Sequence, residues 1–193
     1  MDRSGARTIH LTQNAGKGAA LRAGIAEALK GRGGLLSRDF DFIVTLDGDG
    51  QHDPADIPRL LAAAQRSAAD LVIGGRNLDQ MPPRSRFGNR FSRAMFQLAT
   101  GEFVPDTQSG FRLMSTPLAR ALLDTVRWRR YETEFEILFR TVALGFAVTT
   151  VEIQTIYFDQ NRQSHFQPFR DSMRVFAVTC RHLSLRLRPR SRR

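Results

Sequence analysis

Short apolar, β-branched runs alternate along this chain with longer stretches in which apolar residues recur every three or four positions. The runs at 40–46 and 70–74 are typical of buried strands, and 147–157 alternates like a half-exposed strand. Two further strand regions are expected, one at 8–11 and one as a strand–turn–strand unit over 104–115. Strands that alternate with helices predict an α/β sheet, with a ligand site at the carboxyl ends of the strands. The longer stretches predict helices at 17–29, 54–68, 84–100, 117–126 and 132–144, and a last helix begins at Pro168.

Residues at the ends of these stretches support several of the helix boundaries. Asn14 is expected to cap the first helix, Asp53 the second and Thr116 the fourth, the last two directly before a proline. Gly145 is expected to end the 132–144 helix at the position after its last turn, where glycine is favoured.

The helix expected at 84–100 has an apolar side and a basic side. An apolar stripe at helical spacing is usually core, so most of this one is expected to be buried. The arginines face either a lipid phosphate or water, and both interpretations stay open. The stripe consists of Phe87, Phe91, Met95 or Phe96, and Leu98 or Ala99, and the basic side consists of Arg84, Arg86, Arg90 and Arg93.

Two aspartates, Asp47 and Asp49, follow the 40–46 strand directly, with a glycine on either side of the second. Two close carboxylates repel each other and are best stabilised by a hard divalent cation with oxygen ligands. Such an ion usually takes its remaining ligands from water and from substrate phosphates, so this stretch predicts a metal–diphosphate site. An ordinary Asp-Gly turn is the alternative. An EF-hand loop is excluded, because its sixth and twelfth positions would be His52 and Pro58.

Two basic positions are further candidates for phosphate binding. The Gly-Lys-Gly at 16–18 starts a helix, where the exposed backbone N–H groups and Lys17 are suited to an anion. It lacks the leading glycine and the following Ser or Thr of a Walker A loop, and an ordinary helix entry is the alternative. Arg76 follows the 70–74 strand at the edge expected to carry the two aspartates. It is interpreted either as a phosphate ligand or as a surface arginine.

Three strings of residues together resemble one family. The Asp-Gly-Asp-Gly-Gln-His at 47–52 resembles the Asp-x-Asp-Gly-Gln-His motif of family 2 glycosyltransferases, in particular the polyprenyl-phosphate sugar transferases such as dolichyl-phosphate mannose synthase and its bacterial relatives. The Asp-Thr-Gln-Ser-Gly-Phe-Arg at 106–112 resembles that family's acceptor-side motif, and 14–20 resembles its early helix start. The resemblance implies the Rossmann-like A-type glycosyltransferase fold, as one domain over 1–183 with a mixed, mostly parallel sheet, followed by a basic tail at 184–193.

The resemblance also implies a reaction and a set of site residues. A hexose would pass with inversion from a nucleotide diphosphate sugar to a polyprenyl (dolichyl or undecaprenyl) phosphate. Mg²⁺ or Mn²⁺ would be held by Asp49, with Asp47 and Gln51 nearby. If the acceptor were a sugar hydroxyl, the first candidates for the base would be Glu132 or Glu134, for which an acidic helix start is the alternative. The implied catalytic residues are Asp47, Asp49 and Arg76, Lys17 joins the aspartates in binding the nucleotide sugar, and the acceptor-binding set is Arg86, Gln108, Ser109, Arg112, Ser164 and His165.

Charge narrows the choice of partners. The formal net charge of +10 comes almost wholly from arginine, with lysine only at 17 and 30. It implies an anionic partner, which could be a phosphorylated substrate, an acidic membrane face or nucleic acid. Nucleic acid is the least favoured, because no recognition motif is present and the arginines are scattered apart from the tail. The arginine-rich end at 186–193 is either a solvated tail or an attachment to anionic lipid, worth about 1 kcal/mol per basic residue.

Cysteine content and hydropathy bear on location. A single cysteine, Cys180, excludes an internal disulfide and any cysteine-based metal site, and it fits a reducing compartment. No run approaches the roughly 18 apolar residues of a membrane span. We therefore expect a cytoplasmic protein whose contact with the cytoplasmic membrane face, where present, is peripheral.

The chain departs from the family at its start. Relatives begin with a strand, a Pro-x-x-Asn-Glu loop and a second strand that ends in Asp-Asp-Gly-Ser, and none of these precedes Thr8. We expect the chain to begin inside the fold, lacking roughly two strands, which would leave a sheet edge open and the base pocket incomplete. The alternative to a sugar transferase is therefore an inactive relative that serves as a membrane-associated binding module.

Overall fold

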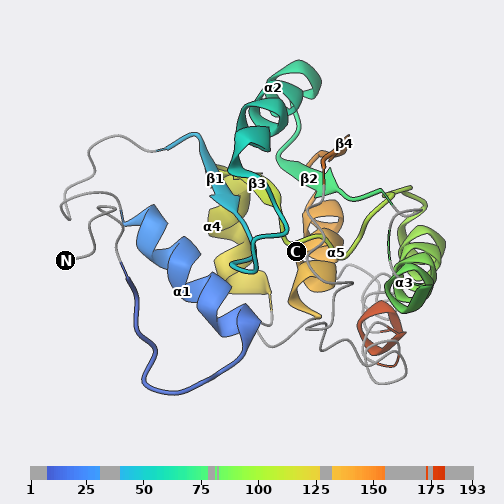
Figure 1. The fold of residues 1–193 in the computed structure, drawn as a ribbon, viewed down its shortest axis with the longest axis horizontal. Coiled ribbons are helices and arrows are strands. Elements are labelled where there is room, and N and C mark those ends of the chain that lie inside the picture. The colour runs from blue at the N-terminus through green and yellow to red at the C-terminus, as the bar shows by residue number, and fades with distance from the viewer. Residues whose placement is uncertain are drawn as a thin grey trace, which may run out of the picture.

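The computed structural model describes residues 8–30, 40–77, 81, 83–126, 132–154, 173 and 176–180. Figure 1 shows these elements along the chain. They are α1 (Lys17–Leu29), β1 (Phe42–Thr45), the 3₁₀ helix η1 (Pro54–Asp56), α2 (Ile57–Ser67), β2 (Leu71–Gly75), α3 (Pro83–Thr100), β3 (Arg112–Ser115), α4 (Thr116–Thr125), α5 (Thr133–Ala143) and β4 (Val148–Glu152).

The four strands form one mixed sheet in the order β1-β3-β2-β4. Strand β3 is antiparallel to both of its neighbours, with Val44 opposite Leu113 and Leu71 opposite Met114. Strands β2 and β4 are parallel. It follows that β1, β2 and β4 point the same way, and that their carboxyl ends share one edge with the start of β3. The expected mixed α/β sheet is confirmed.

Helices cover both faces of the sheet (Figure 1). Alternate residues of a strand point to opposite faces, and the two cores follow this rule. Val72 packs with Leu113 and with α2 on one face, whereas Leu71 and Ile73 pack with α4 and α5 on the other. Helices α1 and α3 extend the second layer through Ile25 and Phe96. Because helices cover both faces of the sheet, a ligand site is expected at the carboxyl ends of the strands.

Several residues that were expected to set a helix end or a buried strand do so in the structure. The carboxylate of Asp53 accepts a hydrogen bond from the Ala55 N–H at 2.9 Å at the start of η1. Gly145 follows α5 with a φ of 82°, a left-handed conformation that glycine adopts without strain. All five residues of β2 are buried, as expected for an apolar run inside a sheet.

Two helix caps differ from expectation. Asn14 lies too early to cap α1; its side-chain oxygen accepts the Gly16 N–H at 3.0 Å, and Gly16 itself stands at the cap. Ser115, the residue before Thr116, caps α4 by accepting the Leu118 N–H at 3.3 Å. In both cases a neighbouring small residue takes the place of the predicted one.

Three strand predictions are corrected. Residues 8–11 are exposed and form no strand, since no described strand lies beside them. The 104–115 unit has only its second strand, β3, because 106–110 forms a tight loop around a buried side chain. Strand β1 is half-buried, because among the described strands it pairs with β3 on one side only.

The apolar stripe of α3 is confirmed in most of its members, since Phe96 and Ala99 are buried and Phe91 and Met95 pack against the core. Phe87 and Leu98 are exposed, at 64% and 75% of their surface. The side that packs inward also carries two buried polar residues that the stripe did not include, Asn89 and Ser92. The buried polar pair indicates that α3 faces a polar cluster and not only the core. Among the described residues, no helix combines the length and apolar character needed to cross a bilayer.

Candidate functional site

Three segments meet at the edge where β1 and β2 end. Asp47 follows β1, Arg76 follows β2, and the loop at 106–111 leads into β3 between them. The Thr45 hydroxyl donates to the carbonyl of Gly110 at 3.1 Å. A Cβ placed on Gly110 would lie 2.5 Å from both carboxylate oxygens of Asp47, so this close approach requires glycine. The loop is thus fitted against the first aspartate.

Lys17 joins three elements at this edge. Its Nζ lies 2.6 Å from Asp47 Oδ1 and 2.6 Å from Glu134 Oε1, which links the start of α1 to the end of β1 and the start of α5. Burial alone would lower the pKa of Lys17, but the Glu134 and Asp47 carboxylates raise it above its usual value. The ammonium is therefore charged at neutral pH and is held between two carboxylates.

Asp49 differs from Asp47 in its surroundings. It is exposed, and its Oδ1 accepts the backbone N–H of Gln51 at 3.1 Å, which closes a tight turn. Asp47, Asp49 and Gln51 supply the hard oxygen donors that Mg²⁺ or Mn²⁺ prefers. Within the described part of the chain, no group of three or more His, Cys, Asp or Glu side chains gathers into a complete metal cage. This donor set fits an ion that completes its shell with phosphate and water.

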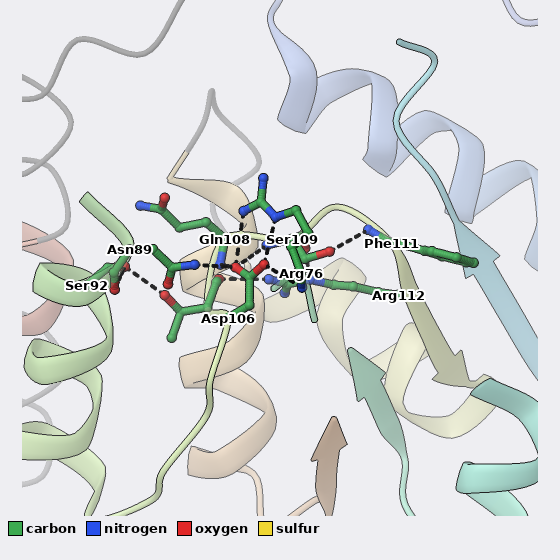
Figure 2. A network of polar contacts seen from close by, with 9 residues as sticks. Arg76, Asn89, Ser92, Asp106, Gln108, Ser109, Phe111 and Arg112 are labelled. Carbon is green, nitrogen blue, oxygen red and sulfur yellow. Dashed lines mark hydrogen bonds and ion pairs between the residues drawn. The ribbon is translucent and has the colours of Figure 1, made fainter. Parts of the chain in front are cut away.

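A fully buried carboxylate, Asp106, organises the loop (Figure 2). Its oxygens accept from Arg76 Nε at 2.7 Å, Arg76 Nη2 at 3.2 Å and the Arg76 backbone N–H at 3.2 Å. They also accept from Asn89 Nδ2 at 2.8 Å and from the N–H groups of Gln108 and Ser109 at 3.0 and 3.1 Å. Burial alone would raise the pKa of Asp106, but Arg76 and the N–H donors hold it below its usual value. The Arg76 side chain is 20% exposed, so the ion pair is accessible to solvent from the arginine side only in part.

Arg112 closes the same loop from inside. Its guanidinium is 1% exposed and donates to the carbonyls of Ser109 (2.8 Å), Thr107 (3.0 Å) and Glu134 (2.6 Å). Burial lowers the pKa of Arg112, and nearby carboxylates oppose that shift. Three carbonyls from two segments therefore tie the loop to the start of α5.

His52 lies inside the site. It is 7% exposed, its ring stacks on Phe111 with centroids 5.4 Å apart, and its Nδ1 is buried without a hydrogen-bond partner among the described residues. Burial lowers the pKa of His52 below its usual value. The charged side chains that act on this ring are Asp47, Arg76, Asp49 and Lys17.

The predicted acceptor residues divide into three groups. Gln108 and Arg86 are partly exposed, and Figure 2 shows the Gln108 side chain pointing away from Asp106, so contact with an acceptor stays a prediction for both. Ser109 and Arg112 are buried and bonded within the loop, so the structure gives them a role in shaping it and does not support direct contact. Ser164 and His165 lie outside the described residues.

Sequence reasoning assigned no role to Asp106, Asn89 or Ser92. An aspartate that accepts the N–H groups two and three residues later is a common turn device, and that signal is present in the Asp-Thr-Gln-Ser at 106–109. The Ser92 hydroxyl lies 2.7 Å from that of Thr107, which couples α3 to the loop. The signal that the sequence offers for Asn89 and Ser92 is that these two polar residues lie three positions apart, and so on one side of the helix.

Comparison with known proteins gives a consistent result. Residues 2–123 match the family model described as glycosyl transferase family 2. The chain is 32% identical over 151 residues to undecaprenyl-phosphate mannosyltransferase of Micrococcus luteus, covering 75% of this chain and 58% of that protein. It is 31% identical over 150 residues to UDP-N-acetylglucosamine–dolichyl-phosphate N-acetylglucosaminyltransferase of Methanococcus voltae, covering 75% and 57%. The chain thus spans little more than half the length of these relatives.

Solved structures support the fold. Glucosyl-3-phosphoglycerate synthase from Mycobacterium tuberculosis in complex with phosphoglyceric acid superposes with a TM-score of 0.64 at 19% identity, covering 90% of this chain and 57% of that one. The same enzyme in complex with Mn²⁺, UDP and glucosyl-3-phosphoglycerate superposes with a TM-score of 0.59 at 19% identity, covering 88% and 55%. At this identity the likeness concerns the fold alone.

Proposed function

The chain belongs to glycosyl transferase family 2, and from that premise we propose that it moves a hexose from a nucleotide diphosphate sugar to a polyprenyl phosphate. Transfer proceeds with inversion at the anomeric carbon. The lipid acceptor is supported by the relatives whose names specify undecaprenyl phosphate and dolichyl phosphate.

One observation carries the proposal, namely the meeting of opposite charges at one edge of the sheet. Asp47 follows β1, Arg76 follows β2, and Lys17 lies 2.6 Å from Asp47. A nucleotide diphosphate sugar needs such a mixture, because cations must hold its phosphates while carboxylates hold the metal that bridges them.

The reaction balances without a strong base. An oxygen of the acceptor phosphate forms a bond to the anomeric carbon while the bond from that carbon to the diphosphate oxygen breaks. The nucleoside diphosphate leaves with the electron pair. Since a phosphate monoester has its second pKa near 6, it is largely ionised at neutral pH and needs positioning more than deprotonation.

The residues of this chain divide the remaining work. Asp49 would hold Mg²⁺ or Mn²⁺, with Asp47 and Gln51 nearby, and the ion when bound supplies Lewis-acid stabilisation of the leaving diphosphate. The Mn²⁺ and UDP in the related synthase support this choice of cofactor. Arg76, oriented by Asp106, adds fixed positive charge at the same edge.

The acceptor's long apolar tail implies contact with a membrane surface. Helix α3 exposes two apolar side chains, Phe87 and Leu98, and the basic Arg90, a combination suited to anionic lipid. Sedimentation with phosphatidylglycerol vesicles, compared with neutral vesicles, tests this part. Equal binding to both vesicle types would remove the electrostatic component.

Transfer of labelled sugar to a short polyprenyl phosphate tests the central proposal. We expect product only with Mn²⁺ or Mg²⁺, none after chelation, and none from Asp49→Ala. Asp124→Ala, at an exposed position of α4, is the matched control and should retain activity. Absence of both metal-dependent nucleotide-sugar binding and transfer would overturn the assignment.

A further inference from the structure

Glu134 lies at the start of α5 with its side chain only 5% exposed. Its carboxylate oxygen Oε1 is 2.6 Å from Lys17 Nζ, and its backbone carbonyl accepts from Arg112 Nη1 at 2.6 Å. A carboxylate that is buried and paired in this way is poorly placed to take a proton from a bound acceptor. The structure therefore argues against the role of general base and raises the question of what Glu134 does.

We propose that Glu134 is a positioning residue, which holds the Lys17 ammonium beside Asp47 and retains it when a divalent cation and a diphosphate enter the site. This inference rests on the proposed function, because it assumes that the cation binds at Asp47 and Asp49. Glu134 acts only through Lys17 and does not touch the reacting atoms.

Lys17 and a divalent cation compete for one carboxylate, that of Asp47. Lys17 Nζ lies at hydrogen-bond distance from Asp47 Oδ1, so a divalent cation that approaches Asp47 meets a like charge. Glu134 offers the same ammonium a second carboxylate at the same distance. Lys17 can therefore turn to Glu134 when Asp47 turns to the cation, and it stays at the site, where it can meet a phosphate.

Neighbouring contacts hold both the Glu134 and the Asp47 segments in place while Lys17 shifts. Arg112 ties the Glu134 backbone to the loop at 106–110, and Asp47 is packed against Gly110 of the same loop. Both carboxylates thus contact the same loop, while the ammonium is carried by a flexible four-carbon chain. Because the ammonium already lies 2.6 Å from both carboxylate oxygens, a small shift of Lys17 alone is enough to free Asp47.

Binding of Mn²⁺ alone, measured from the electron paramagnetic resonance signal of the free ion, tests the inference. Lys17→Met should tighten Mn²⁺ binding, because it removes a competing charge. Glu134→Gln should weaken it, by roughly fivefold or more, because Lys17 then keeps Asp47. In the Lys17→Met background, Glu134→Gln should change Mn²⁺ affinity no more than the control does.

The control is Glu136→Gln. Glu136 lies two residues after Glu134 on the same helix and is 1% exposed. Its carboxylate pairs with Arg140 at 4.0 Å and not with Lys17. It reports the general effect of removing one buried carboxylate from α5. Glu134→Asp, which keeps the charge but withdraws it by one methylene, serves as a second variant if Glu134→Gln unfolds, with the same expected dependence on Lys17.

Two outcomes separate failure of this inference from failure of the proposed function. If Mn²⁺ binds and Asp49→Ala abolishes it, but Glu134→Gln has the same effect with and without Lys17, Glu134 acts by its own charge and the inference is overturned. If no Mn²⁺ binding depends on Asp49, the proposed metal site falls, and the inference falls with it.

Discussion

Replacing Asp106 by asparagine should remove the charge at the centre of the loop while keeping its size. In the native protein the carboxylate accepts six hydrogen bonds, three from Arg76 and one each from Asn89, Gln108 and Ser109. An asparagine offers one acceptor oxygen, and its NH₂ group would face donors. Some of these donors must then lose their partner around a position that is fully buried.

The loss of stability in Asp106→Asn depends on how deeply Asp106 and Arg76 are buried. Breaking a buried ion pair by removing one member typically costs about 3–5 kcal/mol, and a hydrogen bond to a charged group contributes about 1.5–3 kcal/mol. Arg76 is 20% exposed, so its guanidinium recovers part of its solvation after the change. We therefore expect Asp106→Asn to lower the free energy of unfolding by about 2–4 kcal/mol at pH 7.

The effect should depend on pH in a defined direction. The folded state holds the pKa of Asp106 below its ordinary value of 3.8, so its stabilisation is complete above that value and is lost as the pH falls below it. The stability gap between the native protein and Asp106→Asn should therefore narrow in acid. Urea unfolding at several pH values from 7 to 3 measures this gap. The control is Asp124→Asn, on the surface of α4, whose free energy of unfolding should lie within about 0.5 kcal/mol of that of the native protein. A gap under about 1 kcal/mol at pH 7, or a gap that widens in acid, would refute this reasoning.

Two glycine substitutions give opposite expectations. Gly110→Ala places a Cβ 2.5 Å from the Asp47 carboxylate and should weaken Mn²⁺ binding roughly tenfold or more, whereas Gly48→Ala, with nothing within 4 Å of its Cβ, should not. Equal Mn²⁺ affinities for the two variants would contradict the close approach. Gly24→Ala, inside α1 and also clear of neighbours within 4 Å, should raise the free energy of unfolding by about 0.5–1 kcal/mol in urea titration. A loss of stability would show that this part of α1 is packed more tightly.

Sequence patterns predicted the elements whose signals are local. The apolar run of β2, the Asp53 cap and the glycine after α5 depend on residues close in the chain, and the structure confirms them. The strand predicted at 8–11 failed because a strand needs a partner, and pairing is decided far away in the sequence. The prediction that Phe87 belongs to the buried stripe of its helix was wrong for a similar reason. Which side of a helix faces inward depends on what the helix packs against, and Phe87 is exposed.

The site was predictable only in part. Asp47 and Asp49 were located by their position after a strand, which is a local feature. Asp106 was not assigned a role, because its importance comes from Arg76, which lies 30 residues away, and from Asn89 on another helix. A sequence shows that a residue is polar, but it does not show whether that residue is buried among donors.

The direction of β3 explains why one loop governs both sides of the site. Because β3 is antiparallel and lies between β1 and β2, its start reaches the edge where those two strands end. With neighbouring strands about 4.8 Å apart, the ends of β1 and β2, which flank β3, are separated by roughly 10 Å. The loop before β3 lies between these two strand ends, with Gly110 against Asp47 on one side and Asp106 against Arg76 on the other. A change in the loop should therefore alter the carboxylate side and the guanidinium side together, and a parallel central strand would have placed it at the opposite edge.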